Sequence, residues 1–541
     1  MKSLIPVIVV FALFYTGCAN QNNNNTTPPT YKISGMVANL AAGNTRGLVL
    51  QNNATDNLSV MANGNFSFVT TIARGGAYNV TVLTQPSSPT QQCSVANSAG
   101  TAMTNITNIK VECGHNEWAW MSGSQTINQM GTYGTLGTPA AANTPSGRQF
   151  AATWVDSSGD FWLFGGYGKD SNGALLPIND LWKFSAGEWT WIAGPTVGGQ
   201  SGNYGSPGVA TPNGTPGARS EAASWKDAAG NFWLFGGLGY DSVGHEASLN
   251  DLWKYSAGEW TWVGGSALTN KNGVYGAPGV ADPSNIPGAR DQAAVWVDAS
   301  GDVWLFGGMG YDASNTIVGE LSDLWKYSNG QWTWMAGPNV INQKGVYGTL
   351  GTATASNVPG GRFAAAYWID ASGNLWLFGG CGYDSNGSSL ILNDVWKYSG
   401  GQWTWMGGSK VGDQGPVYGT QGTASANNIP GARQFATAWS DSAGNGWVFG
   451  GNGYYGPSSV GELNDLWKFS GGQWTWVNGS NTGNQPSTFA TAGTLDPANA
   501  PGGRDFTTSW MDVNGNLWLF GGFGQASGAS GNLNDLWMYM P

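Results

Sequence analysis

Short runs of alternating apolar and polar residues fill the chain from Tyr31 onward, separated by clusters of turn-forming residues. Residues 47–50 and 65–69 are two such runs. Alternation with a period of two is typical of a strand that has one face on a core and the other in solvent. The first stretch, residues 31–113, is therefore expected to form a small antiparallel β-sandwich.

Beyond this stretch the same pattern recurs six times with a nearly fixed period. The repeat is easiest to follow on its arginines, which are separated by 71, 71, 72, 71 and 71 residues. They are Arg148, Arg219, Arg290, Arg362, Arg433 and Arg504. Six copies at one period indicate a modular array in which each copy packs on its neighbours.

Each copy is predicted to contain four antiparallel strands. In the third copy, short glycine-containing turns join the first strand to the second and the third to the fourth. The four segments are residues 290–298, 302–308, 323–327 and 331–335. The other two connections, 309–319 and 336–361, are expected to be long irregular loops. Because antiparallel strands alternate in direction, both lie on one face of the array, here called the long-connection face.

Three features of the copies resemble kelch repeats over residues 117–541: a second strand ending in Gly-Gly, an aromatic-rich third strand and a Trp in the fourth. The resemblance implies a kelch-type β-propeller of the galactose-oxidase-like superfamily, although each copy is about 20 residues longer than a kelch unit. The last copy has only three strands, so the strand at 117–120 is expected to complete it and close the ring. The predicted fold is all-β, with the sandwich followed by a six-bladed propeller at 114–541.

The first 18 residues read as an export signal, with a lysine near the start, an apolar run and small residues before Cys18. They resemble a bacterial lipoprotein signal, which implies that Cys18 is lipidated and that residues 19–30 form a flexible linker. Tyr15 stands where such signals usually carry an aliphatic residue, so ordinary secretory cleavage is the alternative. The resemblance implies a membrane partner through the lipid anchor, at the outer membrane or cell surface.

Composition narrows the choice of partners. Only 10% of the residues are charged and the formal net charge is −11, so nucleic acid is not an expected partner. The thirty tryptophans divide into five per copy, all in strand positions, and are expected to fill space between blades rather than stack on sugars. Cys93 and Cys113 of an exported chain are expected to form a structural disulfide.

The long-connection face is the candidate binding face, because long loops in compact domains are usually functional. Its ligand-binding candidates are the six arginines, which begin the first strands, and one tyrosine in each of five inter-blade connections. These tyrosines are Tyr133, Tyr204, Tyr275, Tyr347 and Tyr418, and Phe489 takes the equivalent place in the sixth. The kelch resemblance implies that the arginines hold acidic peptides, since guanidinium groups suit carboxylates.

Both candidate sets also have a structural explanation. A tyrosine in a connection can pin its loop to the neighbouring blade. Each arginine can pair internally with the aspartate that begins the third strand of its copy. The aspartates are Asp180, Asp251, Asp323, Asp394, Asp465 and Asp535. The sequence leaves these alternatives open.

Catalysis is not expected. Copper radical oxidases related to galactose oxidase share the fold, but their sites need two histidines, tyrosines and a crosslinked cysteine. Here His115 precedes the array, His245 lies in one loop and Cys381 is the only cysteine of the array. The Gly-x-Asp loops offer too few carboxylates for calcium. We therefore predict no catalytic residues, cofactor or metal, and the near-identity of the six copies favours multivalent binding over one catalytic centre.

The predicted function is that of a surface-exposed lipoprotein that binds a protein or an extracellular polymer through the long-connection face. A lectin-like propeller with several shallow glycan sites is the alternative. A carbohydrate-active oxidase or hydrolase ranks below both.

Overall fold

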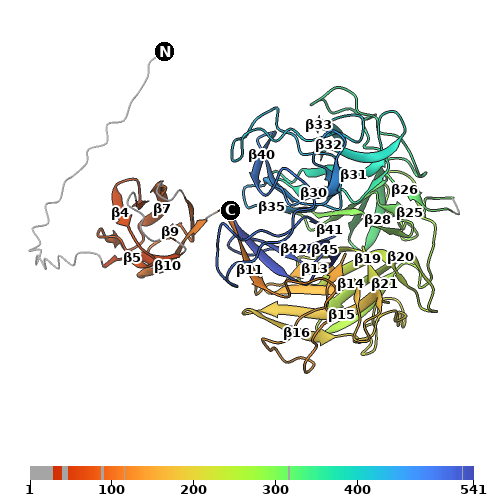
Figure 1. The fold of residues 1–541 in the computed structure, drawn as a ribbon, viewed down its shortest axis with the longest axis horizontal. Helices are drawn as coiled ribbons and strands as arrows, with labels where there is room; N and C mark the ends of the chain where they lie inside the picture. The colour runs from red at the N-terminus through yellow and green to blue at the C-terminus, as the bar shows by residue number, and fades with distance from the viewer. Residues whose placement is uncertain are drawn as a thin grey trace, which may run out of the picture. The chain divides into compact units, whose positions relative to one another are not determined.

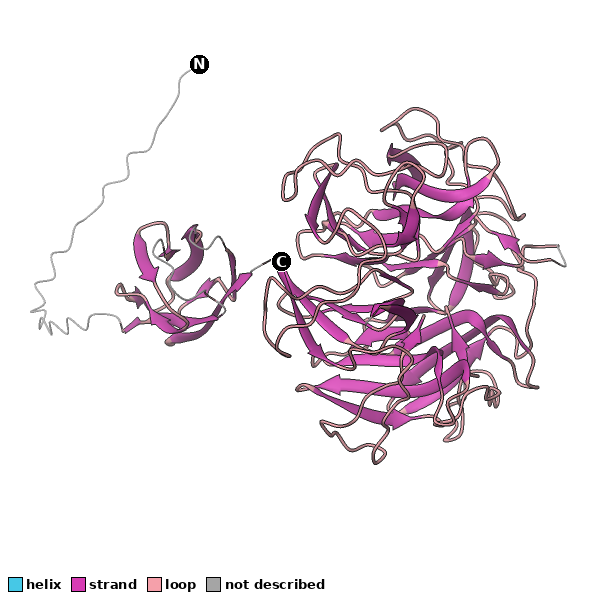
Figure 2. Cartoon of the chain, in the orientation of Figure 1, coloured by secondary structure: helices cyan, strands magenta, loops and turns pink. Residues whose placement is uncertain are grey.

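The computed structural model describes residues 29–38, 40, 47–86, 91–114, 116–314, 317–526 and 528–541. Within these residues the regular secondary structure consists of β-strands, as Figure 2 shows. The described residues contain no helix that is long and apolar enough to span a membrane. The predicted signal and its Cys18 lie outside these residues. The chain divides into two compact units, Met1–Cys113 and Gly114–Pro541.

The N-terminal unit contains two four-stranded sheets, ordered β5-β2-β10-β8 and β4-β3-β7-β9, and a short β1–β6 pair. Residues of both sheets share one core, among them Val37, Leu50 and Val111. The strands are β1 (Thr30–Tyr31), β2 (Ile33–Ala38), β3 (Leu48–Asn52), β4 (Asp56–Val60), β5 (Gly64–Ser67), β6 (Ile72–Ala73), β7 (Ala77–Thr84), β8 (Gln92–Ala96), β9 (Ala99–Thr101) and β10 (Ile106–Gly114).

Two features of this unit bear on the sequence predictions. Cys93 of β8 and Cys113 of β10 form a disulfide. The prediction of a fully antiparallel unit is wrong, because β10 pairs with β2 in parallel. Alternating burial shows which residues face the core but not the direction in which a neighbouring strand runs, so the sequence pattern could not reveal this pairing.

The C-terminal unit consists of six repeated four-stranded sheets, here called blades 1 to 6. The first three contain β12 (Arg148–Gln149), β13 (Ala152–Val155), β14 (Phe161–Lys169), β15 (Leu175–Ser185) and β16 (Glu188–Ala193); β17 (Arg219–Ser220), β18 (Ala223–Lys226), β19 (Phe232–Tyr240), β20 (Glu246–Ser256) and β21 (Glu259–Gly264); and β22 (Arg290–Asp291), β23 (Ala294–Val297), β24 (Val303–Phe306), β25 (Met309–Gly310), β26 (Gly319–Glu320), β27 (Leu324–Ser328) and β28 (Gln331–Ala336).

Blades 4 to 6 follow the same order. Their strands are β29 (Arg362–Phe363), β30 (Ala366–Ile369), β31 (Leu375–Tyr383), β32 (Ser389–Ser399) and β33 (Gln402–Gly407); β34 (Arg433–Gln434), β35 (Thr437–Ser440), β36 (Gly446–Phe449), β37 (Asn452–Tyr454), β38 (Val460–Glu462), β39 (Leu466–Ser470) and β40 (Gln473–Asn478); and β41 (Arg504–Asp505), β42 (Thr508–Met511), β43 (Leu517–Phe520), β44 (Phe523–Ala526), β45 (Ala529–Asn532), β46 (Leu536–Met540) and β11 (Glu117–Ser122).

The innermost strands contact one another in a closed cycle, β13 to β18, β23, β30, β35 and β42 and back to β13. This arrangement is consistent with a six-bladed β-propeller, whose inner strands surround a central channel (Figure 1). β11 pairs antiparallel with β46, with Glu117 opposite Met540, so blade 6 joins the beginning of this unit to its end.

A second closed ring of contacts, made of backbone hydrogen bonds, surrounds the channel. The residue two positions after each arginine donates its N–H to the carbonyl of the equivalent residue in the preceding blade, at 3.0 to 3.3 Å, and Phe150 donates to Phe506 to complete the cycle. All six have positive φ between 54° and 64°. We call this set the channel girdle; it comprises Phe150, Glu221, Gln292, Ala364, Phe435 and Phe506.

The connections are more ordered than the sequence predicted. Strands two and three continue beyond the Gly-Gly pair, so that in blade 1 only residues 170–174 remain as a turn. Each inter-blade connection folds back as a hairpin, for example with Thr132 paired to Thr144. In blade 1 the hairpin tip donates from the Gly137 N–H to the Trp191 carbonyl at 2.8 Å, on the outermost strand. The residues in excess of a kelch unit thus cover a sheet edge that would otherwise be open to aggregation.

The pairing of β11 with β46 predicts a large stability effect. Deleting Glu117–Ser122 from the full chain removes one strand of blade 6 and exposes the edge of β46, and we expect the melting temperature of the C-terminal unit to fall by roughly 10 °C or more. Differential scanning calorimetry measures it. A chain that begins at Gly114 keeps β11 and serves as the control. Equal melting of the deletion variant and this control would contradict ring closure through β11.

Candidate functional site

Each arginine at the start of a blade is part of a buried polar cluster. In blade 3, Nη1 and Nη2 of Arg290 donate to the two carboxylate oxygens of Asp323 at 2.7 and 2.8 Å. The Tyr275 hydroxyl and the Trp325 indole N–H donate to the same carboxylate, each at 2.7 Å. Arg290 also reaches the carbonyl of Gly307 at 3.0 Å. We call this cluster the Arg–Asp node.

The node recurs in every blade with arginine and aspartate side chains that are at most 1% exposed. Its ion pairs join Arg148 to Asp180, Arg219 to Asp251, Arg290 to Asp323, Arg362 to Asp394, Arg433 to Asp465 and Arg504 to Asp535 at 2.6 to 2.7 Å. The six repeated pairs support the resemblance of the blades to kelch repeats. Blade 6 differs in one member, because Phe489 replaces the tyrosine and Ser487 accepts a hydrogen bond from Arg504.

The six candidate arginines are buried, as are three of the five candidate tyrosines, whereas Tyr133 and Tyr418 are partly exposed. The tyrosines Tyr133, Tyr204, Tyr275, Tyr347 and Tyr418 donate to the node aspartates. Two hydrogen bonds to the same aspartates come from each of the arginines Arg148, Arg219, Arg290, Arg362, Arg433 and Arg504. Of the two explanations that the sequence left open, the structure contains the internal ion pair and the pinned loop. The polar groups of these eleven residues are thus engaged in bonds within the protein, and their role in ligand binding stays a prediction.

Electrostatics agree with this structural role. Burial and the charge of Asp323 raise the pKa of Tyr275 well above its usual value. Burial alone would lower the pKa of Arg290, but the charge of Asp323 outweighs it and raises that pKa. Both side chains therefore keep their protons over the physiological range.

The cysteine and one of the histidines that the sequence singled out lie among the described residues, whereas His115 lies outside them. Burial and the charge of Glu320 raise the pKa of the half-buried Cys381 to about 11, which disfavours the thiolate that reactivity requires. The imidazole of His245 is 74% exposed and has only Asp241 beside it. Within the described part of the chain no three His, Cys, Asp or Glu side chains gather as metal ligands.

The aspartates of the Gly-x-Asp turns have structural roles as well. Asp170 accepts the N–H groups of Asn172 and Ala174 at 2.9 Å each, and Gly198 donates to its second oxygen at 3.2 Å. Equivalent bonds hold Asp241 and Asp384. These carboxylates anchor the turn between strands two and three to the next connection.

The tryptophans occupy strand positions as predicted. In blade 1, the indole N–H of Trp154 donates to the Trp225 carbonyl of the neighbouring blade at 3.0 Å, and Trp162 donates to the turn carboxylate of Asp156 at 2.9 Å. Trp182 is fully buried at the node. In these contacts the rings link blades and turns to one another.

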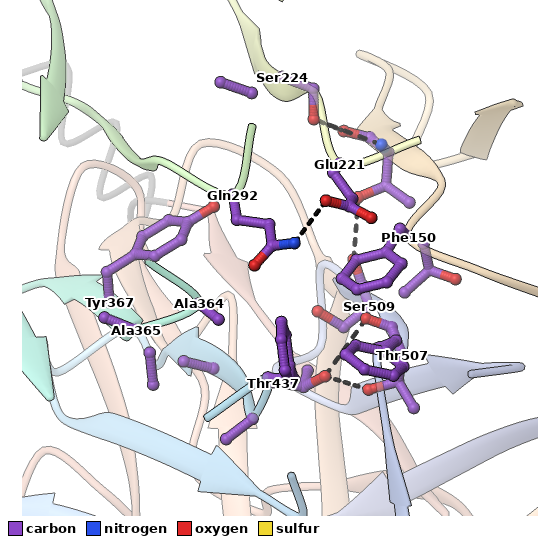
Figure 3. A pocket seen from close by; sticks show the side chains of 18 of the residues that line it. Phe150, Glu221, Ser224, Gln292, Ala364, Ala365, Tyr367, Thr437, Thr507 and Ser509 are labelled. Carbon is purple, nitrogen blue, oxygen red and sulfur yellow. Dashed lines mark hydrogen bonds between the residues drawn. The ribbon is translucent and has the colours of Figure 1, made fainter. Parts of the chain in front are cut away.

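The channel contains a cavity of about 230 Å³ that the innermost strands of all six blades line. Figure 3 shows it with Phe150, Glu221 and Gln292 among the side chains that line it. Because each first strand begins on the long-connection face, the girdle lies toward that end of the channel. Closer to the opposite end, hydroxyls of Thr153 and Ser224 bond to carbonyls of neighbouring blades at 3.3 Å.

The girdle residues differ in chemistry from blade to blade. Blades 5, 6 and 1 contribute Phe435, Phe506 and Phe150, and the ring centroid of Phe506 lies 4.2 Å from each of the other two. Blades 2, 3 and 4 contribute Glu221, Gln292 and Ala364. One half of this ring is thus aromatic, and the other half consists of a carboxylate, an amide and the small side chain of Ala364.

The polar half is centred on Glu221. Its carboxylate accepts a short hydrogen bond from the amide N–H of Gln292, whose own carbonyl oxygen is buried without a hydrogen-bond partner. Burial raises the pKa of Glu221. Tyr367 of blade 4 also lines the cavity, and burial raises the pKa of its hydroxyl to about 12, so it remains protonated. In Figure 3 its ring approaches Gln292 from the side opposite Glu221.

The pattern of the six repeats did not single out this site, although one repeat position carries a signal for it. The arginine is the same in all six copies, whereas the second residue after it is Phe, Glu, Gln, Ala, Phe and Phe in turn. Near-identity elsewhere had argued against a single centre. The structure locates the differing residues together in one cavity, where a sixfold frame can support an asymmetric site.

Two further acids lie beside the girdle without a cationic partner. Burial and the charge of Glu221 raise the pKa of Asp291 to about 8, and the hydroxyl of Ser248 donates to it at 3.1 Å. Burial and the charge of Glu462 raise the pKa of Asp505 to about 8 as well. One oxygen of Asp505 has no hydrogen-bond partner.

No protein-family model matches the sequence, and no curated protein matches it. Among solved structures, YjhT is similar at 15% identity and a TM-score of 0.41, over 75% of this chain and 95% of its own. A fungal alcohol oxidase of the AA5 family, solved in complex with copper, is similar at 13% identity and a TM-score of 0.40, over 76% of this chain and 77% of its own. Likenesses of this extent carry no argument about the chemistry of this chain.

The buried node predicts which substitutions are costly. Asp323→Ala leaves the guanidinium of Arg290 buried and unpaired, and we expect the free energy of unfolding to fall by about 3 to 5 kcal/mol. Tyr275→Phe removes one hydrogen bond and is expected to cost about 1 kcal/mol, since Phe489 fills that place in blade 6. Chemical denaturation measures both. If Asp323→Ala were as stable as Tyr275→Phe, the node would not hold the blade together.

The raised pKa values of Asp291 and Asp505 predict a pH dependence of stability. Each carboxyl binds its proton more tightly in the folded state than in the unfolded chain, so its ionisation destabilises the fold as pH rises from about 4 to about 8. Asp291→Asn and Asp505→Asn should therefore gain about 1 to 3 kcal/mol relative to wild type at pH 8 and little at pH 4. Urea unfolding at both pH values tests this.

The control for this pH dependence of stability is a variant of a carboxyl group whose pKa is shifted in the opposite direction. The exposed carboxylate of Asp282 accepts hydrogen bonds from Ser284, which lowers its pKa. Asp282→Asn should give no gain at pH 8. An equal gain for all three variants would mean that burial of the two channel acids is not the cause.

Proposed function

We propose that the chain is an exported lipoprotein, anchored at Cys18, whose linker leads to a β-sandwich and then to a six-bladed kelch-type propeller. In this proposal the propeller is a binding module that contacts a partner protein through its long-connection face, at the bacterial outer membrane or cell surface. The disulfide between Cys93 and Cys113 supports an oxidising compartment.

The distribution of exposed apolar side chains carries the proposal. In the described part of the C-terminal unit, all of the exposed large hydrophobic residues except Val513 lie in or directly beside the inter-blade connections or the turns between strands two and three. Val513 lies in a short turn on the opposite face. Apolar groups gathered on one side of a molecule are typical of a protein contact surface.

Four of these residues occupy equivalent positions in successive blades. Equivalent positions in the connections leading to blades 2, 3, 4 and 5 present an aliphatic side chain that is 37 to 41% exposed, and we call this set the aliphatic arc; it comprises Val197, Leu268, Val340 and Val411. The carbonyl before each accepts a hydrogen bond from the adjacent turn between strands two and three, at 2.9 to 3.3 Å. These bonds hold the arc beside the turns of the long-connection face.

The arc favours a protein over a glycan. Sugar rings are bound largely through the faces of exposed aromatic side chains. Among the described residues, no Trp or Phe is an exposed large hydrophobic residue. A lectin-like function with several shallow sites, and likewise a carbohydrate-active enzyme, therefore has less support than contact with a protein.

Two aspartates placed in the arc should abolish partner binding. Leu268→Asp together with Val340→Asp introduces charges at the centre of the arc, and we expect at least tenfold weaker retention of the partner. Wild-type and variant ectodomains are immobilised, exposed to surface-protein extract of the producing bacterium, and compared by quantitative mass spectrometry.

Val513→Asp is the matched control, since it adds a charge at an 84% exposed site on the opposite face. A partner that is retained by the control and lost from the arc variant supports the proposal. Equal retention by all three proteins would contradict it, and a saturable signal on a glycan array would replace it with the lectin-like alternative.

A further inference from the structure

We propose that the channel cavity binds a small organic ammonium compound, whose cationic nitrogen meets Glu221 and Gln292 and whose hydrocarbon part lies on Phe150, Phe435 and Phe506. This site is distinct from the aliphatic arc and goes beyond the proposed contact with a protein. It is a single site, because only one half of the girdle is polar.

The Glu221–Gln292 pair on the polar side of the cavity offers acceptors, while the hydroxyl of Tyr367 offers a donor. Gln292 must direct its N–H₂ group at the carboxylate of Glu221, since its carbonyl would be repelled there, and its own oxygen is left buried and unpartnered. The backbone N–H and C=O groups of the girdle are already bonded to one another. A ligand that satisfies these oxygens has to donate hydrogen bonds.

Among ligands that donate hydrogen bonds, the charge of the cavity wall favours a cation. None of the cavity-lining residues that the structure describes is Lys, Arg or His, so the carboxylate of Glu221 has no positive neighbour in the wall. Asp291 adds a second acid close to it. An ammonium group carries up to three N–H donors and a positive charge, and it would supply what this part of the wall lacks.

The aromatic half of the wall suits the remainder of such a ligand. Phe435, Phe506 and Phe150 come from three consecutive blades and pack against one another, and each is half-buried and borders the cavity. Aromatic rings attract cations through their faces and also cover hydrocarbon groups. A cavity of about 230 Å³ admits a compound of the size of an aromatic or short alkyl amine.

The backbone indicates that these side chains are not there to close the ring. All six girdle residues have a left-handed conformation, which glycine adopts at least cost. Ala364 makes the same girdle bonds with only a methyl group. A phenylalanine or a glutamate is therefore not needed for closure. Strained backbone positions that carry large side chains are typical of ligand sites.

Benzylamine is the probe for this site, with benzyl alcohol as its neutral counterpart. We expect saturable binding of benzylamine to the full chain in isothermal titration calorimetry, at least tenfold weakening by Glu221→Gln, and at least fivefold weakening by Phe506→Ala. Ala364 shows that the girdle accommodates alanine, so Phe506→Ala is expected to fold. If Glu221→Gln is unstable, Gln292→Ala provides an independent variant. It removes the second hydrogen-bond acceptor of the site, and Ala364 shows that alanine fits in the girdle.

Glu259→Gln is the matched control, because it removes one negative charge from the exposed first position of β21, in the same blade as Glu221. It should leave benzylamine affinity unchanged, as should the double substitution in the aliphatic arc. No saturable binding up to about 10 mM benzylamine, equal binding by Glu221→Gln and wild type, or equal binding of benzyl alcohol would each overturn the proposal. None of these results would affect the proposed protein contact, which depends on the arc variant alone.

Discussion

The rest of the C-terminal unit depends on the buried ion pair between the first and third strands of each blade. A guanidinium and a carboxylate with no access to water are stable only when each is fully bonded. Arg290 therefore fixes Asp323, and Asp323 in turn fixes Tyr275 of the preceding connection. The Gly-Gly pair belongs to the same constraint: a side chain on Gly307 would lie 2.7 Å from the Arg362 carbonyl of the next blade. One node thus sets the fold of a blade and the approach of its neighbour.

This constraint explains why the repeats are nearly identical where they are buried. A change at a node residue leaves a charge or donor unpaired, so all six copies keep the arginine and the aspartate. The same bonds engage the polar groups of both residues within the protein. Positions that differ among the copies are free of the constraint, and in this chain those near the axis meet in one cavity. A repeat protein can build a single asymmetric site in this way.

Much of the frame could be predicted from the sequence, and the site could not. The spacing of Arg148 to Arg504 gave the number of repeats, and the position of Trp118 and Trp120 indicated which strand completes the sixth. The parallel direction of β10, the continuation of strands past Gly-Gly and the hairpins over the outer edges depend on pairing partners distant in sequence. Whether Tyr275 faces solvent or Asp323 depends on the same long-range packing, since its residue type suits both environments.

The girdle adds a constraint of a different kind. A non-glycine residue in the left-handed region costs about 1 kcal/mol or more relative to the right-handed helix region, and the ring has six of them. The cyclic hydrogen bonds explain why the backbone keeps this conformation, because reversing one residue would break two bonds to neighbouring blades. They do not explain the side chains, since glycine would make the same bonds with less strain. Three phenylalanines on one side and a carboxylate–amide pair on the other therefore reflect a requirement of the channel itself.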